Sequence, residues 1–341
     1  MAAMMTAAFW KSRTAVGLWL VAVALVILGM VIVGGLTRLT GSGLSITEWQ
    51  PIMGAIPPLN DAAWIEAFEK YKLIPQYSQQ NAGMTLEGFK QIFWWEWGHR
   101  FIGRFLGLLF ALPFVWFAAT GAIARKEWPR FVILFVLGGF QGLLGWWMVQ
   151  SGLETRITVA PYRLAIHLGA AVILLGAMVW TALDYLRPPK FGWAPRLNLA
   201  FIGLVYLQII LGALVAGLHA GLIYNTWPDM NGRLFPEDAF YYAPWWSNFF
   251  DNPGLAQFNH RLLAYVIAGA TVAVYLNAIR RGPGVAKNTG KAVTMLVAIQ
   301  IFLGIVTLLF QAPLSLSAIH QTVAALLFCT AVWHAHELRK A

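Results

Sequence analysis

Cysteine and charge are both scarce in this chain of 341 residues, and each scarcity argues against a class of protein. Cys329 is the single cysteine and lies in an apolar stretch, so no intramolecular disulfide can form and a thiol-based mechanism is disfavoured. Charged residues make up 11% of the chain, whereas they are about a quarter of an ordinary soluble domain. With 59% hydrophobic residues, the chain is expected to place its apolar surface against lipid.

Long uncharged runs predict the membrane spans, because an α-helix needs about 20 residues to cross a hydrocarbon core of about 30 Å. A last uncharged tract, Ala292 to His336, is too long for one helix, and residues 311–315 (Gln-Ala-Pro-Leu-Ser) divide it in two. With the six earlier runs this makes eight transmembrane helices. The six runs are Thr14–Thr37, Phe105–Ala124, Phe131–Leu153, Leu164–Leu183, Leu197 to about Leu218, and Leu262–Ile279.

The net charge of +10 could indicate a nucleic-acid partner, but its distribution indicates membrane topology instead. One set of alternate loops and both chain ends hold fourteen basic and three acidic residues, a balance of +11. The remaining ten basic and eleven acidic residues give the opposite side −1. Since basic loops stay inside, both termini are predicted to be cytoplasmic, and no nucleic-acid partner is expected. The segment before the first span is too short and too poor in Arg and Ser for a transit peptide, which favours a bacterial inner membrane.

An internal repeat divides the chain into two halves. Trp97-Gly98-His99-Arg100 matches Phe258-Asn259-His260-Arg261, and Ala165-Ile166-His167 matches Ala318-Ile319-His320. Residues 139–145 correspond in the same way to residues 298–304. Each half has four spans, so both halves insert the same way up. We therefore predict an all-α integral membrane protein with two tandem, pseudo-symmetric four-helix bundles, residues 1–190 and 191–341.

Four of the seven histidines follow this repeat. His99, His167, His260 and His320 are expected near the outer ends of helices that all run from outside to inside. Two imidazoles at one depth can bind opposite faces of a haem iron. A lone membrane histidine more often hydrogen-bonds a neighbouring helix, but packing does not require the same residue four times in register. Zinc is a weaker alternative, since its usual cysteine or carboxylate ligands are missing at short spacing apart from Glu96.

The long outer loop, residues 38–98, is rich in aromatic residues and is expected to form two amphipathic surface helices, capped by Asn60 and Thr85, that cover the first half. Glu96 stands three residues before His99, so on a helix it would share a face with that histidine. The second half has Gln257 instead, which suggests one working site and one supporting site. Glu96 could equally be an interfacial partner of Arg100 or Arg104.

The remaining polar residues near these motifs have simpler interpretations. Arg100 and Arg261, each directly after a histidine, could pair with haem propionates or serve as interfacial basic residues. His219 is expected to be an interfacial hydrogen-bonding residue, and His334 and His336 to suit the cytoplasmic end of a helix dipole.

Taken together, these motifs resemble the haem A synthase family, in the branch without cysteine pairs in the outer loops that occurs in alphaproteobacteria and mitochondria. The resemblance covers nearly the whole chain. It rests on residues 34–45 (Gly-Gly-Leu-Thr-Arg-Leu-Thr-Gly-Ser-Gly-Leu-Ser), Tyr71-Lys72, residues 89–93, residues 96–100, residues 259–261 and the two later histidines.

The resemblance implies a function and a role for each site residue. His260 and His320 would ligate a haem b cofactor, His99 and His167 would face the substrate haem O, and Glu96 matches a glutamate that the family requires. The reaction would oxidise a porphyrin methyl group to a formyl group through a hydroxylated intermediate, giving haem A for cytochrome oxidase. The implied partners are a haem O synthase and an electron acceptor whose identity is open, as are the oxygen source and any homo-oligomer.

Two rival functions use the same features. A di-haem b-type electron carrier would employ the four histidines only to pass electrons, but a transmembrane relay would place its haems near opposite faces. A transporter could be built from duplicated bundles, yet it would not explain the histidine pairs.

The charge balance predicts a topology that reporter fusions can measure. A reporter fused after Ala341 should lie in the cytoplasm. A reporter inserted at Gly83 should lie on the external side of the membrane. The opposite pair of results would refute the arrangement of eight spans.

Overall fold

The computed structural model describes residues 12–188, 192–281 and 284–339, and its regular structure there is helical apart from an isolated bridge between Met230 and Arg233. Eight helices in this part of the chain are long and apolar enough to cross a membrane, which confirms the predicted fold class. The Met1–Lys11 leader, Lys190 and Lys340, which contribute to the predicted charge balance, lie outside the described residues. The eight helices are α2 (Arg13–Leu39), α5 (Leu86–Ala119), α6 (Trp128–Leu153), α7 (Pro161–Leu186), α8 (Arg196–Gly217), α10 (Pro253–Arg281), α11 (Gly284–Leu309) and α12 (Leu314–Glu337).

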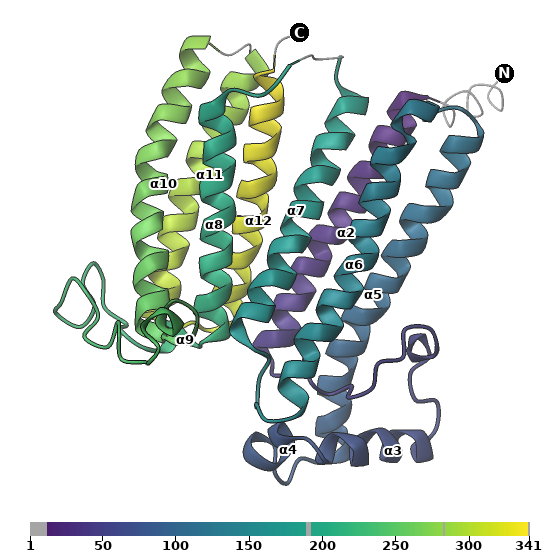
Figure 1. The fold of residues 1–341 in the computed structure, drawn as a ribbon, viewed down its shortest axis with the longest axis vertical. Coiled ribbons are helices and arrows are strands. Elements are labelled where there is room, and N and C mark those ends of the chain that lie inside the picture. Colours follow the sequence, from purple (N-terminus) through teal and green to yellow (C-terminus); the bar gives the residue numbers. More distant parts are fainter. Residues whose placement is uncertain (1–11, 189–191, 282–283, 340–341) are drawn as a thin grey trace.

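Short helices lie in the connections between the spans. They are η1 (Met53–Ala55), α3 (Asp61–Lys72), α4 (Pro75–Gln80), η2 (Arg125–Glu127), η3 (Ala220–Leu222), η4 (Trp245–Ser247) and α9 (Asn248–Asp251). Helices α3, α4 and α9 all lie at the lower end of the molecule in Figure 1, which we call the loop end. Helix α2 begins and α12 ends at the opposite, terminal end.

The spanning helices contact one another in two rings (Figure 1). In the first ring, α2 contacts α5, α5 contacts α6, α6 contacts α7, and α7 contacts α2. In the second, α8 contacts α10 and α12, while α11 contacts α10 and α12. Helices α2 and α7 pack against α12, and α7 also packs against α8, so the two rings share one interface.

Each ring has its own apolar core, and its outer surface is apolar as well. In the first ring, Trp19 packs against Phe110, Phe117 and Phe131, and its indole nitrogen donates to the Leu109 carbonyl at 2.9 Å. Many outward-facing side chains of the spans remain exposed, among them Leu112, Val136, Val272 and Phe302. Such continuous apolar faces match lipid rather than water.

The loop end of the first ring corrects one expectation. Asn60 caps α3 as predicted, with its side chain accepting from Ala63, and Trp64, Phe68 and Tyr71 are buried along one face. Thr85 is also a cap, but the helix that it begins is α5 itself, which runs unbroken for 34 residues. The second expected surface helix is therefore the first part of a span. In this first part of α5, Phe89 packs on Phe68 of α3 and Phe93 packs on Trp64 of α3. These contacts stabilise the helix before its apolar tract begins.

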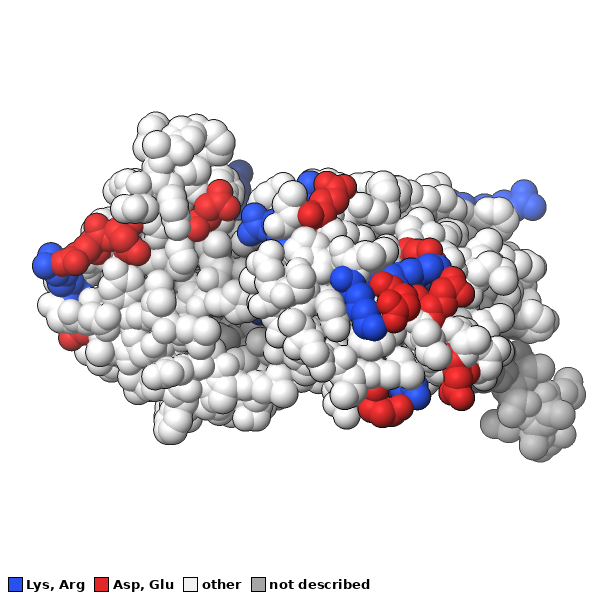
Figure 2. All heavy atoms as spheres, turned by 90° about the horizontal axis from the view of Figure 1, so that it is seen from below, with Lys and Arg blue, Asp and Glu red and all other residues white. Residues whose placement is uncertain are grey.

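The surface of the loop end carries both signs of charge. Figure 2 views the molecule from this end, and red and blue side chains occur together on a largely uncharged face. Pairs such as Lys70 with Glu48 and Glu66 account for part of this mixture. Beneath it, burial raises the pKa of the Tyr71 phenol, whose oxygen accepts from Asn81 and which donates to Gln76 at 3.0 Å. The small net charge predicted for this side agrees with the mixture.

At the terminal end, an ion-pair cluster joins the two rings. Asp184 of α7 contacts Arg130 of α6 at 2.8 Å, His336 of α12 at 2.9 Å and Arg339 at 2.8 Å. His336 is buried beside it, while His334 is buried against Thr289, at 2.9 Å. Both histidines therefore have specific partners on other helices, beyond the helix-dipole effect expected for them.

Removing the charge of Asp184 should destabilise the protein. Asp184→Asn leaves Arg130, His336 and Arg339 without this carboxylate, and we expect a loss of about 1–3 kcal/mol because the cluster is partly buried. Thermal unfolding in detergent measures the loss. The control is Glu87→Gln, which breaks an exposed pair with Lys90 and should cost less than about 1 kcal/mol. Equal effects of the two changes would contradict a structural role for the cluster.

Candidate functional site

The four repeated histidines occupy equivalent helices near the loop end. His99 lies on α5 and His167 on α7, which are opposite members of the first ring. His260 on α10 and His320 on α12 are opposite members of the second. Each imidazole is half-buried, and each lies within the loop-end part of its membrane-spanning helix. Each ring thus holds one pair of histidines that face its interior from opposite helices.

Every one of these imidazoles packs against a glycine of a neighbouring helix. A Cβ atom added to Gly34 of α2 would lie 3.0 Å from Nε2 of His99, and one on Gly145 of α6 would lie 3.3 Å from Cε1 of His167. In the second ring, the corresponding distances are 3.1 Å from Gly212 of α8 to Cε1 of His260 and 3.1 Å from Gly304 of α11 to Cε1 of His320. A side chain at any of the four glycines would press on the ring.

Sequence reasoning missed these four contacts, although part of the signal was available. Gly145 and Gly304 end the aligned segments 139–145 and 298–304, so their equivalence is visible in the repeat. Gly34 and Gly212 lie outside the aligned motifs. The recurrence of a glycine opposite a histidine in both rings strengthens the argument that one site has been duplicated.

The second pair has the more defined surroundings. The rings of His260 and His320 have centroids 6.4 Å apart, with planes inclined at 74°. Gln208 donates to the main-chain oxygen of His260 at 2.9 Å, and Gln300 does the same for His320 at 3.1 Å. Each glutamine nitrogen also lies 3.3 Å from Nε2 of its histidine. Glutamine thus braces both histidines of this pair.

Several polar atoms of these sites have no hydrogen-bond partner. Nδ1 is buried and unpartnered in His167, His260 and His320, as is the side-chain oxygen of Gln208 and of Gln300. Buried polar atoms in proteins are almost always satisfied. Imidazole nitrogens without a partner inside an apolar bundle are therefore atoms at which a ligand or metal is expected.

The donor set indicates what kind of metal centre could form. Among the described residues, no group of three or more His, Cys, Asp and Glu side chains is close enough to hold a metal ion. A metal bound by two imidazoles alone must bring its remaining ligands with it. A porphyrin supplies four nitrogen ligands in a plane and leaves two axial positions for histidine, so the residues present fit haem better than zinc.

Glu96 is almost completely buried, with 3% of its surface exposed, and both carboxylate oxygens accept hydrogen bonds. Oε2 accepts from the Ser45 hydroxyl at 2.7 Å and the Ile46 amide at 2.8 Å, while Oε1 accepts from Arg100 at 2.6 Å. The pairing with Arg100 is one of the two arrangements expected from the sequence. Glu96 therefore fastens the start of the long loop to α5, one helical turn before His99.

Gln257 makes the equivalent connection in the second ring with opposite hydrogen-bond polarity. Its nitrogen donates to the carbonyls of Ala220 and Ile223 at 2.6 and 2.7 Å, and its oxygen accepts from Arg261 at 2.7 Å. The two positions are structurally equivalent, yet only Glu96 carries a charge.

Arg100 and Arg261 hold the loops above their helices. Arg100 donates to the carbonyls of Ile46 and Glu48, and Arg261 donates to those of Tyr224, Thr226 and Asp229. These contacts use much of the hydrogen-bonding capacity of both arginines and leave less of it for the haem propionates that they were expected to bind. His219 is exposed just after α8 with a positive φ of 53°, and its side chain makes no hydrogen bond to another described residue.

A contact between the rings lies beside the histidine pairs. Gln321, which follows His320, donates to the Val31 carbonyl of α2, and its side chain occupies the space that a Cβ on Gly35 would need. Gly34, the preceding residue, faces His99. Two adjacent glycines of α2 thus contact His99 of the first pair and Gln321, the residue that follows His320 of the second.

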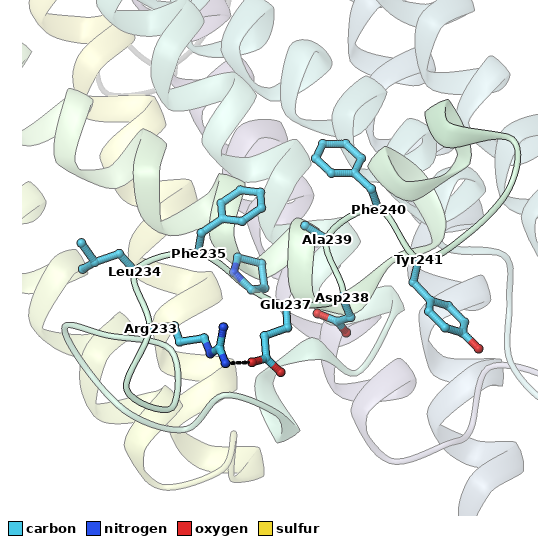
Figure 3. A pocket seen from close by; sticks show the side chains of 9 residues that line it. Arg233, Leu234, Phe235, Glu237, Asp238, Ala239, Phe240 and Tyr241 are labelled. Carbon is cyan, nitrogen blue, oxygen red and sulfur yellow. Dashed lines mark ion pairs between the residues drawn. The ribbon is translucent and has the colours of Figure 1, made fainter.

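A hollow of about 740 Å³ in the α8–α10 connection is lined by residues 233–241 and includes none of the four histidines. Figure 3 shows Arg233 and Glu237 paired across it, with Phe235 and Phe240 pointing toward the helices and Tyr241 away from them. It is a feature of the loop surface, separate from the paired imidazoles.

The eight spans and the duplicated histidine pairs define a polytopic membrane protein with one candidate haem site in each ring. Comparison with known proteins gives the family. A family model described as cytochrome oxidase assembly protein matches residues 17–332, and the chain belongs to that family.

Relatives named haem A synthase match the chain along nearly its whole length. The chain is 48% identical to a haem A synthase of Parvibaculum lavamentivorans over 333 residues, which cover 96% of this chain and 95% of the relative. It is 48% identical to a haem A synthase of Rhodopseudomonas palustris over 324 residues, covering 93% and 89% of the two chains. A haem A synthase of a Caulobacter species is 48% identical over 335 residues, covering 95% and 96%. The resemblance drawn from the motifs is confirmed.

Proposed function

We propose that this protein is a haem A synthase that oxidises a methyl group of haem O to a formyl group, and that its two rings divide the work. The observation that carries the proposal is the pair of histidine sites, each with two imidazoles seated on glycines from opposite helices. The identity of 48% with haem A synthases over nearly the full chain supports the same activity here.

The spacing of the second pair supports haem ligation. Two imidazoles that held one haem iron between them would need their rings to lie close together on opposite sides of it. The rings of His260 and His320 are 6.4 Å apart. A haem b held between them would supply the redox chemistry, and the protein would supply orientation, burial and charge.

The proposed division assigns residues 191–341 to the cofactor and residues 1–190 to the substrate. Both histidines of the second pair are braced by a glutamine, which suits a site that holds its ligand in one fixed orientation. In the first ring the equivalents are Met30, which cannot donate a hydrogen bond, and Gln141, which among the described residues makes no hydrogen bond to His167 like those that Gln208 and Gln300 make to their histidines. A less braced pair, His99 and His167, suits a haem that enters as substrate and leaves as product.

Glu96 is the proposed catalytic residue. Converting the methyl group to a formyl group removes four electrons and four hydrogens from substrate and oxygen donor together, through a hydroxymethyl stage. Positive charge developing on the methyl carbon would be stabilised by a carboxylate that Arg100, Ser45 and Ile46 hold in one orientation. The electrons leave to an acceptor outside this chain, and a haem O synthase is the expected source of substrate.

The proposed location is the bacterial inner membrane, with both termini in the cytoplasm and the histidine pairs near the outer face. The loop end, where both pairs lie, is the side that the charge balance assigns to the exterior. Since both pairs are near one end, a relay of electrons across the membrane, the function of a di-haem carrier, is less well supported.

Replacing either histidine of the second pair should abolish the low-spin haem signal. His260→Ala or His320→Ala leaves the iron with one imidazole, so the absorption and electron paramagnetic resonance spectra of the purified protein should lose the bis-histidine form. His219→Ala is the control, because that exposed histidine is outside both pairs. Unchanged bis-histidine spectra in both variants would refute the cofactor site.

Glu96→Gln should lose haem A formation while the second-ring haem remains bound. Loss of one electrostatic contributor in a buried site should lower the rate about 10²- to 10³-fold. Haem extraction and chromatography from cells that make haem O would measure haem O, the hydroxylated intermediate and haem A.

A second variant separates the charge of Glu96 from its loop contacts. Ser45→Ala removes one donor to Oε2 but keeps the carboxylate, so activity should fall far less than in Glu96→Gln. Similar losses in both variants would mean that Glu96 only fastens the loop. Near-normal haem A in Glu96→Gln would rule out a catalytic role.

A further inference from the structure

Two arginines distinguish the first ring from the second at equivalent positions of the repeat. Arg38 follows Gly34 by four residues on α2, and Arg163 precedes His167 by four residues on α7. Their counterparts, at the same spacing from Gly212 and His320, are Ala216 and Leu316. The duplicated scaffold therefore carries two extra positive charges beside one histidine pair.

Both arginines lie on the loop-end side of that pair. Four residues of α-helix advance about 6 Å along the axis and return to nearly the same face. Arg38 is thus one turn beyond the glycine that seats His99, and Arg163 is one turn beyond His167 itself. Helices α2 and α7 pack directly against each other, so the two residues belong to the same end of the first ring, although the Arg38 guanidinium also reaches the end of α8.

The partners of the two arginines leave their charges unbalanced. Arg38 donates to the Ala216 carbonyl at the end of α8. Arg163 donates to the Trp147 carbonyl at 2.6 Å, and its guanidinium lies 4.6 Å from the centre of the Trp147 ring. In the described part of the chain, no ion pair joins either one to an acidic side chain.

Other arginines around the loop end differ in what they hold, since they pair with a carboxylate or fasten the outer loops. Arg100 pairs with Glu96, and Arg104 donates to the loop carbonyls of Pro51 and Gln50. Arg38 and Arg163 are half-buried in spanning helices, where an unpaired charge is costly and usually has a functional partner. A guanidinium has five N–H donors, so both retain donors for an anion.

We infer that Arg38 and Arg163 bind the carboxylate groups at one edge of the porphyrin substrate in the first ring, an inference that rests on the proposed function. A haem is apolar except for two carboxylates on one edge. Because the membrane interior penalises charge, that edge faces the loop end when the iron is level with His99 and His167. Guanidinium groups match carboxylates in shape and charge, and two of them stand one turn beyond the histidines.

The second ring offers no such pair, because Ala216 and Leu316 are apolar. The two sites therefore differ in how they hold a porphyrin. The first selects it by charge at the carboxylate edge, while the second depends on its glutamine-braced histidines.

Binding titrations with a porphyrin and its ester test this assignment directly. The protein is purified with its second-ring haem and titrated with haem b or haem b dimethyl ester, whose carboxylates carry no charge, and binding is followed by absorption. The wild type should bind the free acid about 10- to 100-fold more tightly than the ester. Arg38→Gln and Arg163→Gln should each weaken binding of the free acid about 10-fold or more and leave ester binding unchanged.

Combined and control variants sharpen the result. The double variant should bind both porphyrins equally, and Arg38→Lys and Arg163→Lys should recover part of the preference. Arg104→Gln is the matched control, since it removes a loop-end arginine that serves the loop alone. Thermal unfolding without added porphyrin should be unchanged or raised in the double variant, whereas a purely structural role would lower it.

Two outcomes would overturn the arginine assignment, and only one of them would also overturn the proposed function. A wild type that binds a second equivalent of both porphyrins equally, with no effect of the variants, refutes the arginine site alone. A wild type that binds no second equivalent of either porphyrin refutes the substrate site of the proposed function as well.

Discussion

The close approach of an imidazole to a neighbouring helix backbone is the constraint around which this molecule is built. At Gly34, Gly145, Gly212 and Gly304, the missing side chain leaves room for a histidine ring from the next helix. A larger residue would push the helices apart and turn the ring away from the bundle interior. Helix spacing, ring orientation and the separation of the paired imidazoles therefore depend on the same contacts. In lipid, where apolar burial does not drive helices together, such small residues also permit the close packing that holds them.

On this duplicated frame, a few polar substitutions separate the two rings. Glu96 and Gln257 fasten equivalent loops with opposite hydrogen-bond polarity. Gln208 braces a histidine in the second ring, where the first has Met30. Arg38 and Arg163 stand where the second ring has Ala216 and Leu316. The scaffold thus remains nearly symmetric while these three additional charges, at Glu96, Arg38 and Arg163, occur in the first ring alone, which agrees with one site that performs chemistry and one that supports it.

The sequence predicted the number of spans and the repeated histidines because both follow from composition and local order. It could not predict what depends on packing between distant residues. With 32 glycines in the chain, no local pattern marks the four that face histidines. Asp184 and His336 are 152 positions apart, so their ion pair appears only when α7 and α12 are assembled. The length of α5 was underestimated because Glu96, Arg100 and Arg104 interrupt its apolar tract, whereas aromatic contacts with α3 and the loop carbonyls stabilise the helix there.

The contact of Gln321 with Gly35 and Val31 makes the two halves a single indivisible unit. Helix α2 is at once a wall of the first histidine pair and the acceptor for a side chain of the second half. If the first half were produced alone, Gly35 would face lipid without the side chain that packs on it. If the second half were produced alone, the amide of Gln321 would face lipid without a hydrogen-bond acceptor. Neither duplicated half is complete without the other, because the contact between them forms part of both interiors.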